Sequence, residues 1–384
     1  MDTNDFLGSF AQENVSFTTR VVKTAVVGDN FWKCMIFVEN DRFVTASDPV
    51  WTAVPGSSTI KALSVSADDY AEYTTGLLQS WLYDLFCNGF TGDCILVACA
   101  DKDDAPTNFI EQMEVAYGLM KAYAYHKTVC AGGDTLDTNF ASCAAKLAEL
   151  CAIDKNLLSS APYLPYSSGT PTDTSSDPLY STVLASGDAF MAAHQDASRN
   201  AALYSLGLAM STLNNSGTCI GNSFDMVKSS NITCSGPQGT NLAKGIRDTL
   251  RGLNIQTFKP VGDNTGSVAA IGAKTLKGDV VQATWIVAYV TYMTKVAVAQ
   301  LITTNNFLKN EASYGRIIGV MMSYLALFGP QGSGRLKDLN STAPGFDQLP
   351  TAAEDVIIIP DAWEATYVDQ VREVQITGTL YIGA

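Results

Sequence analysis

Both ends of the chain carry strand patterns. Near the C-terminus apolar side chains alternate with polar ones, and one phase of the alternation holds Val374, Ile376, Leu380 and Ile382. This period of two predicts a half-buried β-strand. Because an unpaired strand leaves a row of backbone donors and acceptors open, we expect another strand to pair with it.

A second extended arm is predicted at the N-terminus. The segment VSFTTRVVKTAVV, residues 15–27, is rich in β-branched side chains, and its candidate pairing residues are Val21, Val22 and Val26. We therefore assign residues 1–27 to an N-terminal arm and residues 371–384 to a C-terminal arm strand.

Helical and strand patterns alternate between the two arms. Leu78, Trp81, Leu82 and Leu85 recur at helical spacing, and the continuous apolar run CILVACA that follows predicts a buried strand. A strand is also predicted at KCMIFVE, and another before the first helix. Further helices are predicted around 109–124, 139–151, 185–213, 280–302 and 311–328, with strand and turn residues at 256–278 and a loop after Gly329-Pro330.

The alternation predicts an α/β (α+β) fold with more than one domain. A chain of 384 residues exceeds the size at which one hydrophobic core stops growing. We expect a mixed-sheet main domain over 28–239, with a Ser/Thr/Pro-rich outer loop or insertion at about 159–181. A C-terminal α/β domain is expected over 240–370.

The net charge is strongly acidic but unevenly distributed. The chain has 24 lysines and arginines against 38 aspartates and glutamates, for a net charge of −14. An acidic surface repels phosphate backbones, so we expect no nucleic-acid binding. Residues 240–340, in contrast, hold eleven Lys or Arg and five Asp or Glu. Such a molecule is suited to dock on an acidic surface or on another copy of itself.

The apolar segment from Val280 to Ile302 is long enough to span a bilayer. Thr284, Thr291 and Lys295 would align in one narrow polar stripe of this helix. We therefore expect a nearly buried helix of a protein outside the membrane, and a membrane protein is the lesser alternative.

Cysteine usage leaves two interpretations open. The acidic N-terminus does not resemble a secretion signal, no CxxC pair is present, and two histidines are too few for the usual mixed zinc sites. The thiols are then either buried small hydrophobes or, if the protein ends up outside the cell, partly oxidised, with the odd count leaving at least one free or bonded to another subunit. The residues concerned are Cys34, Cys87, Cys94, Cys99, Cys130, Cys143, Cys151, Cys219 and Cys234.

None of the sequence patterns that resemble a catalytic motif is more specific than a chance match. His126 is expected at a helix end, and His194 on a helix where Asp196 would face away from it. The pattern Ser58-x-x-Lys61 lacks the companion motifs of serine acylases, and the glycine-rich segment 329–335 lacks the GK[ST] of a phosphate-binding loop. We expect adjacent acids to be turns and caps. We predict no catalytic, cofactor or metal site, and no enzyme.

Three segments in order resemble one known family. They are LLQSWLYDLFCNGFTGDCILVACA (77–100), NIQTFKPVGDNTGSVAAIGAKTLKG (254–278) followed by an apolar helix, and EVQITGTLYIGA (373–384). With extended arms at both ends, they resemble the sheath proteins of contractile bacteriophage tails and related injection machines. The resemblance covers most of the chain but not the Ser/Thr/Pro-rich stretch at 159–181.

The resemblance implies a structural protein that assembles with copies of itself. Such sheaths polymerise as stacked hexameric rings around a tail tube and shorten to drive it through the host envelope. Their arms add strands to sheets of neighbouring subunits, which here would involve the valine-rich segments of both ends. Baseplate and tail terminator proteins would be further partners. The protein would be assembled in the host cytoplasm and belong to the virion.

The family's C-terminal domain faces the tube, and the basic section of this chain falls in the same region. The residues expected to contact an acidic tube are Lys309, Arg316, Arg335 and Lys337. In this setting, disulfides between subunits would form after release from the cytoplasm. The alternatives are another self-assembling structural protein (tube, baseplate or shell) and an α/β enzyme with an unrecognised site.

Overall fold

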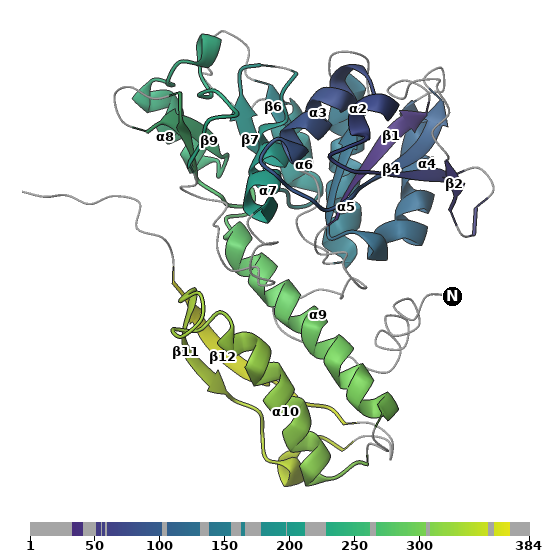
Figure 1. Cartoon of the computed structure of the whole chain (residues 1–384), viewed down its shortest axis with the longest axis vertical. Coiled ribbons are helices and arrows are strands. Elements are labelled where there is room, and N and C mark those ends of the chain that lie inside the picture. The colour runs from purple at the N-terminus through teal and green to yellow at the C-terminus, as the bar shows by residue number, and fades with distance from the viewer. Residues whose placement is uncertain are drawn as a thin grey trace, which may run out of the picture.

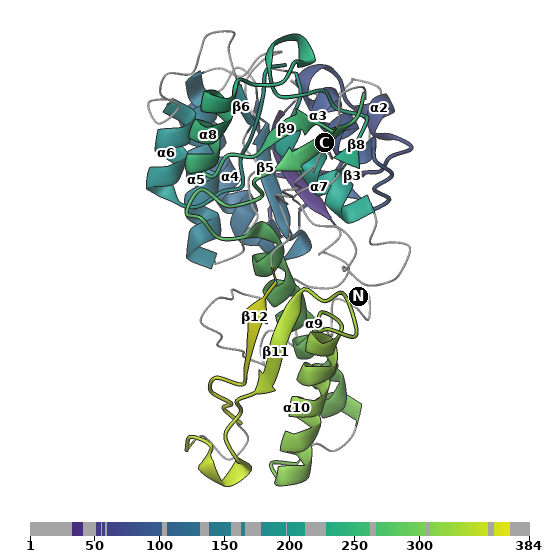
Figure 2. The same cartoon turned by 90° about the vertical axis from the view of Figure 1, so that its left-hand side faces the viewer.

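A globular upper body and an elongated lower part make up the chain, joined by one long helix (Figures 1 and 2). The computed structural model describes residues 33–40, 51–101, 106–130, 138–154, 163–165, 178–211, 228–261, 266–304, 308–351 and 357–368, apart from 55, 58, 59 and 197.

A five-stranded mixed sheet forms the centre of the body, in the order β2-β3-β4-β1-β5. Its strands are β1 (Cys34–Asn40), β2 (Thr52–Ala53), β3 (Lys61–Val65), β4 (Cys94–Asp101) and β5 (His126–Cys130). β1 pairs in parallel with both β4 and β5, whereas β3 is antiparallel to β4 and β2 to β3. The apolar run of β1 is fully buried, as expected of a central parallel strand. The predicted α/β class with a mixed sheet is confirmed.

Helices connect and cover these strands. They are α2 (Tyr70–Tyr73), α3 (Gly76–Phe86), α4 (Pro106–Met120) with the 3-10 turn η2 (Lys121–Tyr123), α5 (Thr138–Asp154), α6 (Pro178–Ser186) and α7 (Ala201–Ser211). α4 packs on α5, α5 on α6, and α3 on α7. The four apolar residues that predicted α3 are all fully buried.

Small sheets complete the body. β6 (Tyr163–Pro165) pairs in parallel with β7 (Ala192–His194), and β8 (Lys228–Ser229), β10 (Val268–Ile271) and β9 (Thr257–Pro260) form an antiparallel sheet. The 3-10 turn η5 (Pro237–Gly239) and α8 (Lys244–Gly252) lie between β8 and β9.

The single helix predicted over 185–213 is wrong, because β7 separates α6 from α7. Gly187 lies so close to α5 that a Cβ there would overlap the Ala148 carbonyl. The Asp188 carboxylate accepts a hydrogen bond from the next amide, Ala189 N, at 2.9 Å. This local bond favours a turn over a continuing helix.

The lower part consists of two helices and a ribbon. α9 (Val281–Thr304) leaves the body and α10 (Glu311–Ala326) packs along it, starting at the cap Asn310, whose side chain accepts a hydrogen bond from Ser313 N at 2.9 Å. β11 (Leu336–Ser341) then pairs antiparallel with β12 (Trp363–Tyr367), with the 3-10 turn η6 (Phe346–Gln348) between them. The ribbon replaces the loop predicted after α10, since LKDLNS shows no apolar alternation.

The division in space falls at α9. α8 and β9 lie in the upper body, so the sequence boundary at residue 240 does not separate the two parts seen in Figures 1 and 2. The pairing residues predicted in the arms lie outside the described residues, namely Val21, Val22, Val26, Val374, Ile376, Leu380 and Ile382. Most of the stretch 159–181 lies outside them too.

Candidate functional site

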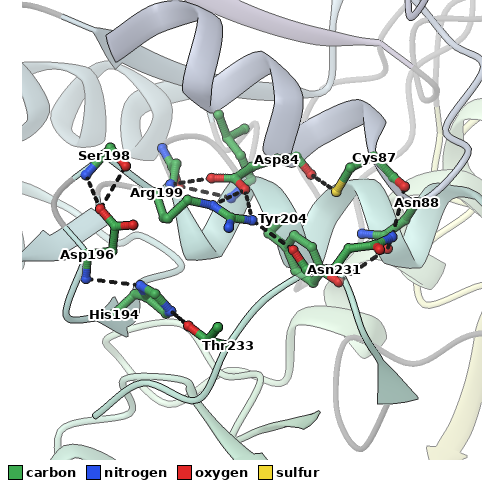
Figure 3. A network of polar contacts seen from close by, with 12 residues as sticks. Asp84, Cys87, Asn88, His194, Asp196, Ser198, Arg199, Tyr204, Asn231 and Thr233 are labelled. Atoms are coloured by element: carbon green, nitrogen blue, oxygen red, sulfur yellow. Dashed lines mark hydrogen bonds and ion pairs between the residues drawn. The ribbon is translucent and has the colours of Figure 1, made fainter. Parts of the chain in front are cut away.

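A buried ion pair is the centre of the main polar cluster in the body (Figure 3). The Asp84 side chain on α3 is fully buried, and its Oδ1 lies 2.5 Å from Nη2 and 2.6 Å from Nε of Arg199. Its Oδ2 accepts a hydrogen bond from Asn200 N at 2.7 Å. Both carboxylate oxygens are therefore occupied, and the segment before α7 is fixed to α3.

A group of amides and hydroxyls extends this cluster towards β8. Arg199 Nη2 donates to the Asn231 carbonyl at 3.0 Å, and Asn231 Nδ2 donates to Asn88 Oδ1 at 3.1 Å. The Tyr204 hydroxyl donates to the same Asn88 oxygen at 3.2 Å and also contacts the Ser229 hydroxyl. The cluster thus joins three separate segments of the chain. Several of its hydrogen bonds connect residues that lie more than a hundred positions apart in the sequence.

Burial dominates the electrostatics of this pair. It raises the pKa of Asp84 to about 6, although the Arg199 guanidinium opposes the shift. A fully buried carboxyl that is held by an arginine and a backbone amide fixes structural segments to each other. The geometry supports a structural role for the cluster.

The two histidines differ from their expected settings. His126 lies buried in β5 and does not end a helix. His194 ends β7, and its Nδ1 accepts a hydrogen bond from Asp196 N at 3.1 Å, so these neighbours do interact. Its Nε2 lies 3.2 Å from the Thr233 hydroxyl. Burial, with a smaller effect of Arg199, lowers the pKa of His194, which favours the neutral ring.

Two buried lysines carry charge into the interior. Lys127 on β5 donates from Nζ to the Ala124 carbonyl at 2.6 Å, and its Nζ lies 5.7 Å from the Tyr117 ring centroid. Lys295 on α9 is 7% exposed, and burial lowers its pKa. The sequence pattern predicted Lys295 on a polar stripe but gave no indication that Lys127 is buried.

α9 matches the predicted long helix, and its three predicted stripe residues are all buried. Within the described part of the chain, Val281–Ile302 is the one segment apolar and long enough to cross a membrane. Of its most apolar window, 61% is buried inside the protein. The aromatic rings of Tyr289 on α9 and Phe328 after α10 meet edge to face at 5.9 Å. These contacts are those of a core helix.

The four predicted tube-contacting residues all lie in the lower part. Lys309 precedes α10, Arg316 is exposed on α10, Lys337 is exposed on β11, and Arg335 comes just before that strand. They share a region of the molecule but come from separate elements.

The thiols are mostly interior groups. Eight cysteines are free in the described residues, and all of these are buried except the half-buried Cys87. Burial raises the pKa of the Cys87 thiol to about 12. Cys219 lies outside the described residues. Among the described residues, no three His, Cys, Asp or Glu side chains come together as a metal site.

The polar motifs weighed in the sequence fall in turns. Ser58 lies outside the described residues, and Lys61 begins β3 on an exposed position. The glycine-rich segment 329–335 forms the turn between α10 and β11. Asp69 Oδ1 accepts a hydrogen bond from Ser66 N at 2.6 Å, so this acid stabilises a turn as expected.

Comparison with known proteins identifies the fold. No protein-family model and no curated protein matches the chain. A chain of the six-fold symmetrised cryo-EM structure of the anti-feeding prophage (AFP) baseplate aligns with a TM-score of 0.60 at 13% identity, covering 96% of this chain and 98% of that one. A chain of the contracted PVC sheath complex of an extracellular contractile injection system aligns with a TM-score of 0.55 at 12% identity, covering 95% and 96%. The protein therefore has the fold of components of contractile injection systems.

Proposed function

We propose that this protein is a sheath subunit of a contractile tail. It polymerises as stacked hexameric rings around a tail tube, and the stack shortens to drive the tube through an envelope. Its partners are copies of itself, the tube protein, and the baseplate and terminator proteins at the two ends. It is assembled in the host cytoplasm and acts as part of a virion or virion-like particle.

The observation that carries this proposal is the extent of the structural likeness. The alignment to the contracted PVC sheath chain covers 95% of this chain and 96% of the other, so the body and the lower part are matched together. A catalytic domain grafted onto a shared core would leave part of one chain unmatched. The buried Asp84–Arg199 cluster, which joins segments and exposes no reactive group, supports the same structural role.

The β11–β12 ribbon supports a linkage through added strands. Within the described residues this sheet has two strands, and a two-stranded ribbon alone is marginally stable in water. An irregularity in β11 includes Asp338, whose φ is +54°, and it interrupts the ladder between the two strands. In the proposal, the arm strands of neighbouring copies extend this ribbon by main-chain hydrogen bonds.

Disulfides between subunits are proposed for the thiols outside the core. Among the described cysteines burial leaves Cys87 as the candidate, because a thiol enclosed in one chain cannot reach another without local opening. Non-reducing electrophoresis of intact particles tests this, and monomeric chains alone would refute it.

Electron microscopy of the purified protein tests the main proposal. A sheath subunit forms long hollow cylinders, alone or on a tube, that exist in a long narrow and a short wide form. Discrete soluble oligomers under all conditions would refute the proposal.

A second candidate function is a baseplate component, because one aligned chain comes from a baseplate structure. Such a component would form a single six-fold disc that does not grow with concentration. Cylinder length measured against protein concentration therefore separates the two candidates.

A further inference from the structure

Charge is separated across the upper body. The described residues within 61–154 hold ten Asp or Glu and four Lys, whereas those within 228–280 hold seven Lys or Arg and two Asp. Figure 1 places α4 and α8 on opposite sides of the body, and Figure 2, viewed along that direction, shows them nearly superposed. The acidic range contains α4 and the basic range contains α8, so the two ranges place helices on opposite sides of the body.

An apolar stripe with acids beside it runs along the surface of α4. Glu111, Val115, Leu119 and Tyr123 follow one another at intervals of four, so they lie on one side of α4 and η2. Val115 is 56% exposed, Leu119 36% and Tyr123 40%. Glu114 adds a second exposed carboxylate and lies 3.4 Å from Lys146 Nζ. Scattered exposed apolar residues are ordinary, but three in line are typical of a contact surface.

The opposite side presents cations on α8. Lys244, Arg247 and Arg251 recur at i, i+3 and i+7, so they share one side of the helix, while Leu250 is buried on the other. Asp248 lies among them, with its Oδ2 2.5 Å from Lys244 Nζ. Arginine stems cover apolar surface and their guanidinium groups stack on tyrosine rings. This surface thus complements both the acids and the apolar stripe of α4.

We propose that the α4 surface of one copy docks on the α8 surface of the next copy. This inference rests on the proposed self-assembly and names the contact through which the bodies meet. Glu111 and Glu114 are about one helical turn apart, as are Arg247 and Arg251, so with the two helices antiparallel Glu111 faces Arg251 and Glu114 faces Arg247. Two different surfaces on opposite sides make a head-to-tail contact, which closes into rings or continues as a helix.

Charge reversal tests the contact in the full-length chain. Glu111 and Arg251 are exposed, and neither forms an ion pair among the described residues, so reversing them leaves the fold intact. We expect Glu111→Lys and Arg251→Glu each to raise the protein concentration needed for assembly by at least about tenfold, because like charges then meet. The double variant Glu111→Lys/Arg251→Glu restores assembly towards the wild-type concentration. Circular dichroism verifies folding of each variant.

Mixing the two single variants tests whether α4 of one copy meets α8 of another copy. The Glu111→Lys chain keeps its basic α8, and the Arg251→Glu chain keeps its acidic α4, so together they restore one contact per pair. Analytical ultracentrifugation below the assembly concentration should then show more dimer in the mixture than in either variant alone.

Single variants that assemble like the wild type, or a double variant that is no better than either single, would overturn the inference. These outcomes leave the proposed function standing, because the wild-type chain still assembles. A wild-type chain that never assembles overturns the proposed function itself.

Discussion

The Asp84–Arg199 pair shows how one buried charge makes another necessary. Asp84 lies on the buried side of α3, where an unpaired carboxylate would lower the stability of the fold. Arg199 and Asn200 N supply that partner from a segment far along the chain. The pair therefore fixes the packing of α3 against the segment that starts α7.

Replacing Arg199 should be costly, and the cost should depend on pH. We expect Arg199→Leu to lower the free energy of unfolding by about 3–5 kcal/mol at pH 7.5, because the Asp84 carboxylate is left buried and unpaired. Since the wild-type pKa of Asp84 is already raised to about 6, the variant protonates Asp84 on mild acidification, and the cost shrinks at pH 5.

Urea unfolding at pH 7.5 and pH 5 measures both values. The exposed Arg251→Leu serves as the control and should change stability by less than about 0.5 kcal/mol at either pH. In the wild type, the raised pKa of Asp84 stabilises the fold below about pH 4, and this contribution is lost as the pH rises through 6. A cost for Arg199→Leu equal at both pH values would contradict the role given to Asp84.

Lys295 makes the opposite case, a buried cation without a carboxylate beside it in the described residues. Burial lowers its pKa, so folding loses stability as the pH falls from about 10.5 towards the folded value. We expect Lys295→Met to raise Tm at pH 7.5 and the gain to shrink towards pH 10. Thermal unfolding across this range checks the trend, and Thr284→Val on the same helix provides a comparison without a titrating group.

The sequence predicted which residues are buried better than it predicted which residues contact each other. The apolar positions of α3 could be assigned from spacing alone, because helical period and burial are coupled within a few residues. Asp84 stands in that same helix without any local sign of its partner. Arg199 lies 115 residues away, and a contact at such separation is decided by topology that no local pattern contains.

Helices meet closely where glycine removes the side chain. Gly207 of α7 lies against α3 so tightly that a Cβ would overlap the Leu85 carbonyl. Gly319 of α10 has no atom within 4 Å of the same position. Replacing either glycine by alanine therefore adds the same methyl group, to a tight contact at Gly207 and to open space at Gly319.

Alanine at these two positions should act in opposite directions. We expect Gly207→Ala to lower the free energy of unfolding by about 1–3 kcal/mol through overpacking. Gly319→Ala should raise it by about 0.5–1 kcal/mol, because alanine favours the helix. Denaturant unfolding measures the free energy of unfolding of both variants. Equal effects would show that α3 and α7 can move apart to accommodate the added methyl group at residue 207 without loss of stability.

Long periodic elements were predictable and short ones were not. α9, α10, α3 and β4 extend over enough residues for a period to be read. β7 has three residues and β8 two, so neither contains a full pattern, and β11 shows no alternation of apolar and polar residues. Their pairing depends on partners supplied by the rest of the fold, which explains the wrong helix over 185–213 and the missed ribbon.

At the scale of the whole molecule, assembly should depend on the C-terminal arm. We expect deletion of residues 371–384 to leave a folded chain that no longer polymerises, because the strand proposed to link neighbours is removed. Circular dichroism and electron microscopy of the same preparation provide the two readouts. A truncated chain that still builds cylinders would show that this strand pairs within its own chain.

The basic residues of the lower part should matter for the tube. We expect charge reversal at Lys309, Arg316, Arg335 and Lys337 to reduce assembly on the tube, because these residues are proposed to meet an acidic tube surface. Cosedimentation with purified tubes measures the loss, and raising the salt concentration should mimic it. Unchanged tube-dependent assembly would remove these residues from the contact.

α9 is one uninterrupted helix and can act as a rigid lever arm. Its 24 residues contain neither proline nor glycine, so it is a stiff rod of about 36 Å. If the body turned by about 10° around the upper end of such a rod, the lower end would swing by about 6 Å, more than the spacing of about 4.8 Å between paired strands. A linkage made of strands survives that swing only if the lower part stays in place while the body turns about it. In the proposed assembly, α9 would therefore convert a small rotation of each body into a larger displacement, with the hinge at the proposed strand linkage.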